Sequence, residues 1–549
     1  MEKSVYESMS GDSKDKTKVQ SWEEIVQAIR NDMNTHPSED KLVSLEDLVR
    51  DYKKVKSSPK HRQNQRKVPP PIFSRDWREH DEESKNLPVR ILQLTERIAW
   101  DSPLQRCLLS FAIFPENSII KKRSLIYWWI GQELIFQKED RTAEQEGEDI
   151  YNELLKQGLI EPDDNDPSPL MNRCKMHPLI RYMLILKAKE EGLFYFKLED
   201  NNTPKDLRNC SLSSSHLRLR VGGLIFGGED GPQEKLAKDE EVSTAFNVNQ
   251  QYLNLPHHWL SNMRNLKVLQ LGRWQHSPMH HIEVDDQKFL DELGVHHKHL
   301  KFLSLRGISR ITSLPDSIVQ LVNLEILDLR ACHNLEKLPE DIASLKKLTH
   351  LDVSECYLIE RMPKGTEKLS SLQVLKGFVI GTARKNPCKI SDLKKLKKLR
   401  RLSIYIGRGA AIGGEEFASL KDVASLCSLT ISWGVTSLAS QSSLPKDQFL
   451  PKKLEKLELI GMPVASIPKW LNPQELENLK KLYIIGGELA NWDRQQQNEQ
   501  WSVEILRLKH LRKLRIGNNE DVLKKFPRLG YFEKINCADD DVLWYKSRE

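Results

Sequence analysis

The 549-residue chain contains no Cys-x-x-Cys pair, and its eight cysteines are scattered at positions 107, 174, 210, 332, 356, 388, 427 and 537. This spacing excludes a zinc ribbon, a thioredoxin-type redox site and a dense disulfide scaffold. It is typical of a reduced, intracellular protein, so we expect a cytoplasmic location with no metal and no cofactor.

Long hydrophobic runs are also missing. The most hydrophobic stretch, residues 125–136, is interrupted by Gly131 and Glu133 and is too short to span a bilayer. The N-terminal residues 1–16 lack the apolar segment of a secretory signal. Lysine and arginine total 84 against 78 aspartate and glutamate residues, a net charge of +6. So small an excess does not by itself predict nucleic-acid binding.

The sequence contains no Gly-Lys dipeptide. A nucleotide-binding phosphate loop, GxxxxGK[S/T], is therefore absent. No Ser/His/Asp or Cys/His arrangement and no pair of carboxylates stands out as a catalytic group. We therefore expect a protein that is not an enzyme and has no small-molecule substrate.

What the chain does contain is a repeat of 24 residues. The pattern Leu300-x-x-Leu303-x-Leu305 recurs as Leu324/Leu327/Leu329, then as Leu348/Leu351/Val353, then as Leu372/Leu375. The full unit reads LxxLxLxx(C/I)xxLxxLPxxIxxL, in which xxLxL forms a short strand with inward leucines and the second half returns along the convex side. Cys332 and Cys356 share position 9, where we expect a buried thiol to bond the backbone of the adjacent turn.

Looser copies extend the array at both ends. A degenerate first strand is expected at Leu217/Leu219, and the last copy is expected at Leu511/Leu514/Ile516. We predict about ten units in one curved solenoid over residues 205–535, followed by a tail at 536–549.

Residues 84–200 show helical patterns followed by a turn-rich segment, which suits a winged-helix domain. A basic triplet, Lys121-Lys122-Arg123, begins one helix, but that helix continues as Leu125-Ile-Tyr-Trp-Trp-Ile130. Such a face belongs to a core, whereas a DNA-recognition helix exposes polar residues.

Residues 1–83 are polar and contain two short amphipathic helices, at 21–33 and 42–52. A basic segment at 52–67 follows, either a solvated linker or a nuclear-import or anionic-surface element. The fold class is therefore α/β: a C-terminal leucine-rich-repeat horseshoe, an α-rich winged-helix domain before it, and a partly disordered helical N-terminus.

Strand positions 3, 5 and 7 of each unit point away from the leucine core and form the concave face. Exposed apolar residues beside arginine and aspartate suit protein recognition. Alternatively, these residues pack against the chain's own winged helix. The candidate partner-binding residues are Phe302, Arg306, Ile326, Asp328, Arg330, His350, Asp352, Lys376, Phe378, Arg401, Tyr405 and Tyr483.

Histidines are concentrated in residues 257–299, beside Asp285 and Asp286. Imidazoles and carboxylates together can bind zinc or copper. The irregular spacing, in an insertion between repeats, favours a solvated loop instead.

These segments together resemble the plant NLR disease-resistance proteins. The segment CLLSFAIFPENSIIKKRSLIYWWIGQELI (107–135) looks like the motif that opens the family's winged-helix domain, with Phe114-Pro115-Glu116 and Trp129-Ile130 in place. CKMHPLIRYM (174–183) looks like the family's Met-His-Asp region, and the LPxxI repeats belong to the same class. The resemblance runs from residue 84 to the C-terminus.

This sequence also departs from the pattern of the family. His177 corresponds to the family's ADP-contacting histidine, but Pro178 replaces the aspartate. Proline is tolerated at the first position of a helix, so the helix can still start there. Fewer than ninety residues precede the winged helix, too few for the family's nucleotide-binding domain. We expect an NLR-like protein without its own nucleotide switch, whose N-terminal helices dock a separate protein, such as a nucleotide-binding subunit.

Two functions follow as hypotheses. The first is a defence protein that recognises or scaffolds partner proteins through its repeats. The alternative is a basic module that binds nucleic acid through residues 52–67 or the cationic C-terminal repeats. Salt would distinguish them, because phosphate contacts weaken steeply as the salt concentration rises.

Overall fold

The computed structural model describes residues 102–115, 118–163 and 169–177, residues 180, 181, 184, 188, 194–196 and 221–223, and most of 242–545. Within 242–545 it leaves out 248–250, 254, 256–262, 276–280, 286, 382–386, 408, 411–413, 435–448, 493–499, 517–518 and 539–540. The helices expected at 21–33 and 42–52, the basic segment 52–67 and the strand expected at Leu217/Leu219 lie outside the described residues.

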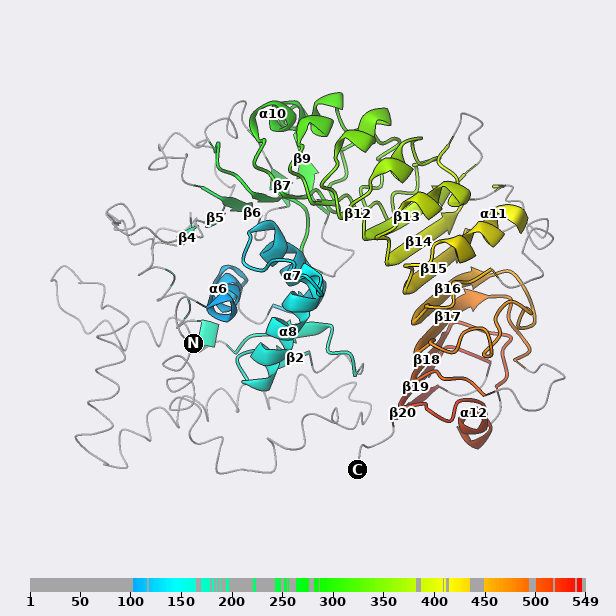
Figure 1. Ribbon diagram of the computed structural model, residues 1–549. Helices are drawn as coiled ribbons and strands as arrows, with labels where there is room; N and C mark the ends of the chain where they lie inside the picture. The colour runs from blue at the N-terminus through cyan, green and yellow to red at the C-terminus, as the bar shows by residue number, and fades with distance from the viewer. Residues whose placement is uncertain are drawn as a thin grey trace, which may run out of the picture.

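A long parallel sheet curves into an arc, and the helices of the N-terminal domain lie inside it (Figure 1). The sheet has 15 strands in sequence order, all parallel except the last. The predicted horseshoe is thus confirmed. None of the helices in the described ranges is long and apolar enough to cross a membrane. The strands are β4 Phe194–Phe196, β5 Val221–Gly223, β6 Thr244–Phe246, β8 Val268–Gln270, β10 Phe302–Ser304, β11 Ile326–Asp328, β12 His350–Asp352, β13 Val374–Ile380, β14 Arg401–Ile406, β15 Ser428–Trp433, β16 Lys456–Met462, β17 Lys481–Gly487, β18 Ile505–Lys509, β19 Tyr531–Ile535 and β20 Val542–Tyr545.

Short helices cover the convex side of the arc. In the two units that read LPxxI, Pro315 and Pro339 precede the short helices η7 and η8, and proline sets the entry to a single helical turn. Two further strands, β7 Tyr252–Leu253 and β9 Glu283–Val284, pair apart from the main sheet. The convex helices are α10 Phe289–His296, η7 Asp316–Gln320, η8 Glu340–Ser344, η9 Thr366–Lys368, η10 Ile390–Lys395, α11 Gly414–Ala418, η11 Ser419–Asp422 and α12 Asn519–Lys525.

The N-terminal domain is small and helical. It contains α6 Pro103–Leu109, η4 Ser110–Ile113, α7 Lys122–Gly131 and α8 Ala143–Lys156, with a three-stranded sheet of β1 Ile120–Lys121, β3 Arg173–Lys175 and β2 Glu161–Pro162. Thr142 and Gln145 form a capping box at the start of α8, which satisfies backbone donors there. Trp128 and Trp129 are buried, as the core face predicted for this helix requires.

The leucine register is the one that the repeat predicts. Leu303 aligns with Leu327, Leu327 with Leu351, and Leu351 with Leu375 across successive strands. All four side chains are buried in one continuous core. Each unit therefore buries its apolar side only against its neighbours, as a solenoid requires.

The two position-9 cysteines are structural, as predicted. The thiol of Cys332 donates to the carbonyl of Leu305 at 3.1 Å, and that of Cys356 donates to Leu329 at 3.1 Å. Both thiols are buried, and burial raises the pKa of each. A neutral thiol that spans adjacent repeats is a poor nucleophile, so neither cysteine suits redox chemistry.

Position 8 of the unit turns the chain at the end of the strand. Gly307, Ala331 and Glu355 occupy this position with φ of 74°, 61° and 65°. The N–H of Ala331 donates to the carbonyl of Ser354 at 2.8 Å in the next repeat. Because a left-handed backbone is unfavourable for alanine and glutamate, the stacking of neighbouring repeats must impose this corner.

The expected register of the last units is wrong. The strand is β18, with Leu506 and Leu508 buried, whereas Leu511 and Leu514 lie in the return half of the same unit. The strand half reads Val503-x-x-Leu506-x-Leu508 and the return half reads Leu511-x-x-Leu514-x-Ile516, and the insertion at 494–500 removes the fixed spacing that would separate them. The sheet also extends past the expected limits of 205 and 535, to β4 and β20.

The solvated loop expected at 257–299 is wrong for its described part. β9 Glu283–Val284 and α10 Phe289–His296 lie in this region, and Phe289, Leu290 and Leu293 pack into the solenoid core. Their helical spacing places them on one face. His297 is buried at the end of α10. The described residues contain no group of three histidine, cysteine or acidic side chains suited to a metal.

Candidate functional site: the winged helix on the concave face

The end of α7 lies against β8 and β10 on the concave face. Phe302 and Ile326 share one apolar cluster with the winged-helix core. A Cβ atom added at Gly131 would lie 2.4 Å from Cβ of Phe302, so only glycine allows this approach. Of the two occupants considered for Phe302 and Ile326, the structure places the chain's own winged helix there.

Aromatic rings continue this contact. Phe114 lies edge-to-face with Phe246 of β6, at 5.6 Å between centroids, and with Trp274, at 4.9 Å. Trp128 of α7 lies 5.3 Å from Phe246. The Phe114-Pro115 motif therefore joins the two domains as well as filling the core of one.

A polar cluster lies further along the arc. Glu144 of α8 contacts Nε2 of His350 at 3.1 Å and forms an ion pair with Arg401. Nη2 of Arg401 also donates to the Tyr127 hydroxyl at 3.4 Å, and the Tyr127 ring lies 4.7 Å from the His350 ring. Burial opposes ionisation, but Arg401 and His350 hold the pKa of Glu144 well below its ordinary value. Burial also lowers the pKa of His350.

A second polar cluster surrounds Glu133, which lies just after α7. Glu133 forms ion pairs with Lys267 and with Lys301, the latter at 2.6 Å. Lys301 also contacts Glu325 at 3.1 Å. The two lysines lower the pKa of Glu133 although its burial opposes them. Both clusters place a carboxylate of the winged helix against basic side chains of the repeats.

The predicted residues on β11 to β13 pair mainly with one another. Lys376 contacts Asp352 at 2.9 Å, and Arg330 forms an ion pair with Glu355. Lys376 and Arg330 hold the pKa of Asp352 below its ordinary value despite burial. Burial and the nearby Asp352 raise the pKa of Asp328. The acidic and basic side chains at these strands therefore neutralise one another.

Lys121 is the exception to this neutralisation. Burial together with Arg306 and Arg330 lowers the pKa of Lys121 to about 7. Nε of Arg306 has no hydrogen-bond partner among the described residues, although the side chain is buried. The winged helix thus brings cations together here, which opposes its own docking.

Contact with the winged-helix domain resumes near the C-terminal end of the arc. Leu170, in the turn before β3, packs against Tyr483, Ile505 and Tyr531. Cations lie over the tyrosine rings: Arg507 is 5.0 Å from the Tyr483 centroid and 5.5 Å from that of Tyr531. The domain therefore touches repeats at both ends of the arc.

Two predicted residues differ in their placement. Phe378 is buried in the solenoid core, so the prediction that it faces outward is wrong. The register shifts between Lys376 and Phe378, because Gly377 takes a φ of 77° and forms a bulge. Tyr405 is half-buried, with its ring 5.8 Å from that of Tyr357.

His177 lies where the chain enters the helix described at residues 180 and 181. Its carbonyl accepts from the N–H of Arg181 at 3.0 Å, and its side chain is half-buried. Nε of Arg181 donates to the carbonyl of Phe114, which ties this helix to the aromatic contact.

Sequence reasoning missed the residues of the winged helix that complete the site: Tyr127, Glu133, Glu144 and Leu170. No motif marks them, because each is an ordinary surface position until the second domain covers it. Only Gly131 could have pointed to this contact from the sequence, because it is a glycine at the end of an otherwise apolar helix.

Comparison with known proteins agrees with this architecture. Residues 244–537 match the family described as leucine-rich repeat region, and residues 113–184 match the disease resistance protein winged helix domain. A solved leucine-rich-repeat protein of Leptospira interrogans is similar over 54% of this chain and 72% of its own, at 18% identity and a TM-score of 0.27.

Two relatives from Arabidopsis thaliana are similar in sequence. Disease resistance RPP13-like protein 4 is 30% identical over 417 residues, which is 75% of this chain and 46% of the relative. Disease resistance protein RPP8 is 32% identical over 144 residues, 26% of this chain and 15% of the relative. The chain thus spans less than half the length of either. It belongs to the plant NLR-type family of disease-resistance proteins, of which it carries the winged-helix domain and the leucine-rich repeats.

Proposed function

We propose that this chain is a non-enzymatic defence protein whose leucine-rich repeats bind partner proteins. The observation that carries the proposal is the concave face itself, where Tyr483, Tyr531 and Arg507 combine aromatic and guanidinium groups. These residue types are enriched at the centres of protein interfaces. The present occupant of the face is a protein domain, which supports this chemistry.

The winged helix acts in this proposal as a removable cover. Its contact with β12 and β14 is ionic, through Glu144, and Lys121 opposes docking at β11. Displacement of the cover breaks the buried Glu144–Arg401 pair and separates the apolar cluster that Phe302 and Ile326 share with the winged helix, so a partner must replace both contacts. A partner that binds the concave face would displace the cover.

The proposal includes the absence of a nucleotide switch in this chain. It is supported by the missing Gly-Lys dipeptide and by Pro178 after His177. The N-terminal segment 1–83 would dock a separate signalling or nucleotide-binding subunit. Removal of 1–83 should then abolish co-purification of that subunit while the melting temperature of the remaining chain stays unchanged. Retention of every partner together with a lower melting temperature would contradict this part.

The recognition role is tested by capture from plant tissue with the full chain. Glu144→Gln, which weakens the cover, should increase the amount of captured protein. Adding Lys481→Glu, a change of charge on the concave face, should remove that gain. Lys337→Glu, an exposed change on the return half of a repeat, serves as the control. Capture that is equal for all variants would contradict the proposal.

A further inference from the structure

A two-residue turn precedes the first leucine of each repeat, and all these turns lie at the same edge of the sheet. In successive repeats the turns are 298–299, 322–323, 346–347, 370–371, 397–398, 424–425 and 452–453. Of these seven, the turns 346–347, 397–398 and 452–453 each hold a lysine pair and none holds an acidic residue, whereas the next turn, 477–478, holds Glu477. We name these pairs the lysine edge: Lys346, Lys347, Lys397, Lys398, Lys452 and Lys453, all exposed.

Hydrogen bonds between neighbouring turns keep the edge regular. Nδ2 of Asn323 donates to the carbonyl of Lys298 at 2.7 Å, and the Ser425 hydroxyl donates to Leu399 at 2.8 Å. Nδ2 of Asn478 donates to the carbonyl of Lys452 at 3.0 Å. Because parallel strands are about 4.8 Å apart, lysine pairs in alternate repeats are spaced by about 10 Å.

Little protein charge neutralises this row. Lys346, Lys397, Lys398 and Lys453 form no ion pair with a described residue. Lys452 lies 3.7 Å from Glu475, at an exposed position. The row therefore presents positive charge to the surroundings of the protein, and its lysines repel one another.

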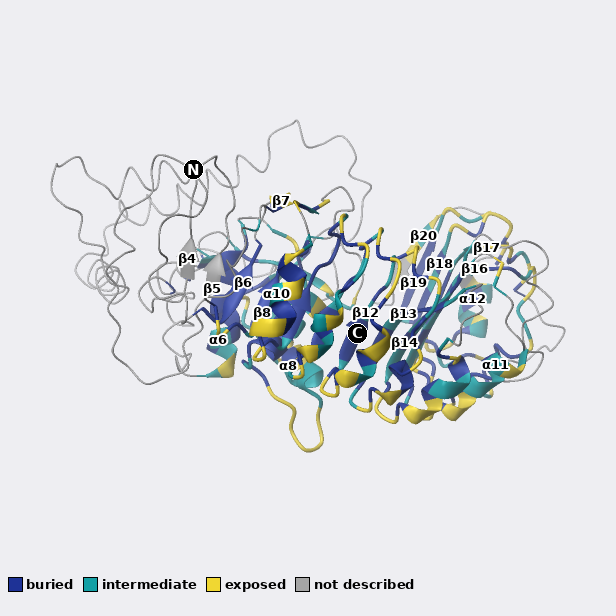
Figure 2. Cartoon of the chain, turned by 90° about the horizontal axis from the view of Figure 1, so that it is seen from above, coloured by how far each residue is buried: buried dark blue, intermediate teal, exposed yellow. Residues whose placement is uncertain are grey.

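Apolar side chains project from the same edge. Val322 occupies one of the uncharged turns, and Val295 lies on α10 just before the first turn; both are about half exposed. Phe136 is 62% exposed and lines a cavity of about 100 Å³ with Lys301, the residue next to Leu300. Its segment, residues 136–141, is exposed and projects beside α8 (Figure 2).

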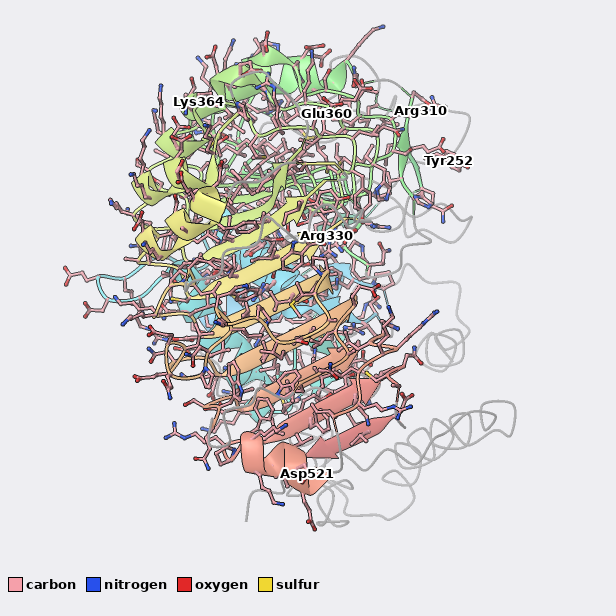
Figure 3. The ribbon with its side chains drawn as sticks, turned by 90° about the vertical axis from the view of Figure 1, so that its right-hand side faces the viewer. Tyr252, Arg310, Arg330, Glu360, Lys364 and Asp521 are labelled. Carbon is pink, nitrogen blue, oxygen red and sulfur yellow. The ribbon has the colours of Figure 1, made fainter. Side chains whose placement is uncertain are left out.

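The opposite edge differs in character. Figure 3 shows Tyr252 and Arg310 there, whereas the convex helices and the projecting segment before α8 lie on the other side. Arg310 lies 3.9 Å from Glu283. Unneutralised lysines combined with exposed Phe136, Val295 and Val322 are thus a property of one edge.

We propose that the lysine edge binds the surface of an anionic lipid bilayer, with Phe136, Val295 and Val322 entering the headgroup region. A bilayer interface accepts both features, since it attracts lysine by charge and takes up apolar side chains. A nucleic-acid backbone offers the charge without a place for the apolar groups. The cations are lysines, which act as point charges, whereas bidentate phosphate recognition favours arginine.

Vesicle flotation of the full chain tests the proposal. Phosphatidylcholine vesicles that contain phosphatidylserine should bind the protein, and pure phosphatidylcholine vesicles should not. Because each lysine near an anionic surface adds to the attraction, K397E/K398E should reduce the partition coefficient at least about tenfold. K337E/K469E, with the same charge change at exposed positions on the return halves of two repeats, should leave it within about twofold.

Two more variants separate the apolar contribution from the charge. Phe136→Ala should weaken binding at physiological salt, where charge is screened. K346Q/K347Q should weaken binding as K397E/K398E does, although it neutralises two lysines instead of reversing their charge. If K397E/K398E and K337E/K469E reduced vesicle binding equally, the loss would reflect net charge alone and the proposal would be overturned. Unchanged binding in K397E/K398E would overturn it in favour of the basic segment 52–67. Tighter, edge-dependent binding to a DNA duplex than to vesicles would overturn it in favour of nucleic acid.

Discussion

Glu144 in α8 and His350 in β12 are 206 positions apart in the chain and lie 3.1 Å apart, Oε1 to Nε2. Arg401, two strands further along the sheet, shares the same carboxylate oxygen. One acidic side chain of the winged helix therefore holds two buried bases of the repeats. Its loss would leave the Arg401 guanidinium buried without a counter-ion.

Glu144→Gln should open the contact between the domains. The amide keeps the shape but removes the charge, so we expect a loss of about 2–4 kcal/mol in the stability of the contact. Hydrogen exchange should increase in α8 and β14. Glu148→Gln, an exposed change on the same helix, is the control. Unchanged exchange in Glu144→Gln would mean that the ion pair does not hold the cover.

Lys121→Gln should stabilise the folded chain. In the unfolded chain the lysine keeps its proton up to about pH 10.5, whereas in the folded protein its pKa is about 7. Between these values the unfolded state holds more protons, so the free energy of unfolding rises with pH. The substitution should add about 1–2 kcal/mol at pH 7, after allowance for solvent screening.

Chemical denaturation at several pH values measures this effect. The gain from Lys121→Gln should be full below pH 7 and shrink as the pH rises toward 10.5. Arg123→Gln, an exposed neighbour, should give no such pH dependence. A gain that is equal at every pH would refute the electrostatic explanation.

Leu327→Asp should destabilise the repeats by several kcal/mol, because it buries an unpaired carboxylate between strands. Thermal melting by circular dichroism measures the loss. Val322→Asp, in the exposed turn of the same unit, should melt like the parent protein. Unchanged melting of Leu327→Asp would contradict the strand register.

Gly131→Ala should separate the winged helix from β10. The new methyl group would meet Cβ of Phe302, which cannot move without its strand. We expect a loss of about 1–3 kcal/mol, the usual cost of overpacking. Increased trypsin cleavage in the segment between the two domains would report the separation, and an unchanged cleavage rate would exclude the close approach.

Titration calorimetry of the purified full chain with ADP or ATP should show no specific binding. The expectation follows from the missing Gly-Lys dipeptide, since a phosphate loop needs that lysine. Micromolar affinity that is abolished by His177→Ala would overturn it.

The solenoid could be predicted from the sequence because its period is strict. Leu303, Leu327 and Leu351 recur at constant spacing, and a parallel sheet converts constant spacing into alignment. The prediction failed where spacing was lost, at Leu511 and Leu514. It failed again at Phe378, where the left-handed Gly377 shifts the register by one residue and so reverses the face.

The cover could not be predicted in the same way. Glu133, Glu144 and Leu170 follow no repeat, and their partners lie more than a hundred residues away. Whether a concave residue meets a partner or its own chain depends on the length and path of the connection, which periodicity does not encode. The interpretation of the helix after the basic triplet was better, because Leu125, Trp128 and Trp129 form the buried face that was predicted for it.

Leu170 contacts β17 to β19 while Gly131 contacts β10, so one rigid domain braces repeats that otherwise touch only their neighbours. An unbraced array of repeats can fray from either end, unit by unit. With the brace in place, losing an end unit also strains the far side of the arc. Release of the winged helix would therefore change the curvature of the solenoid and make its unfolding less cooperative, even at strands that the winged helix never touches.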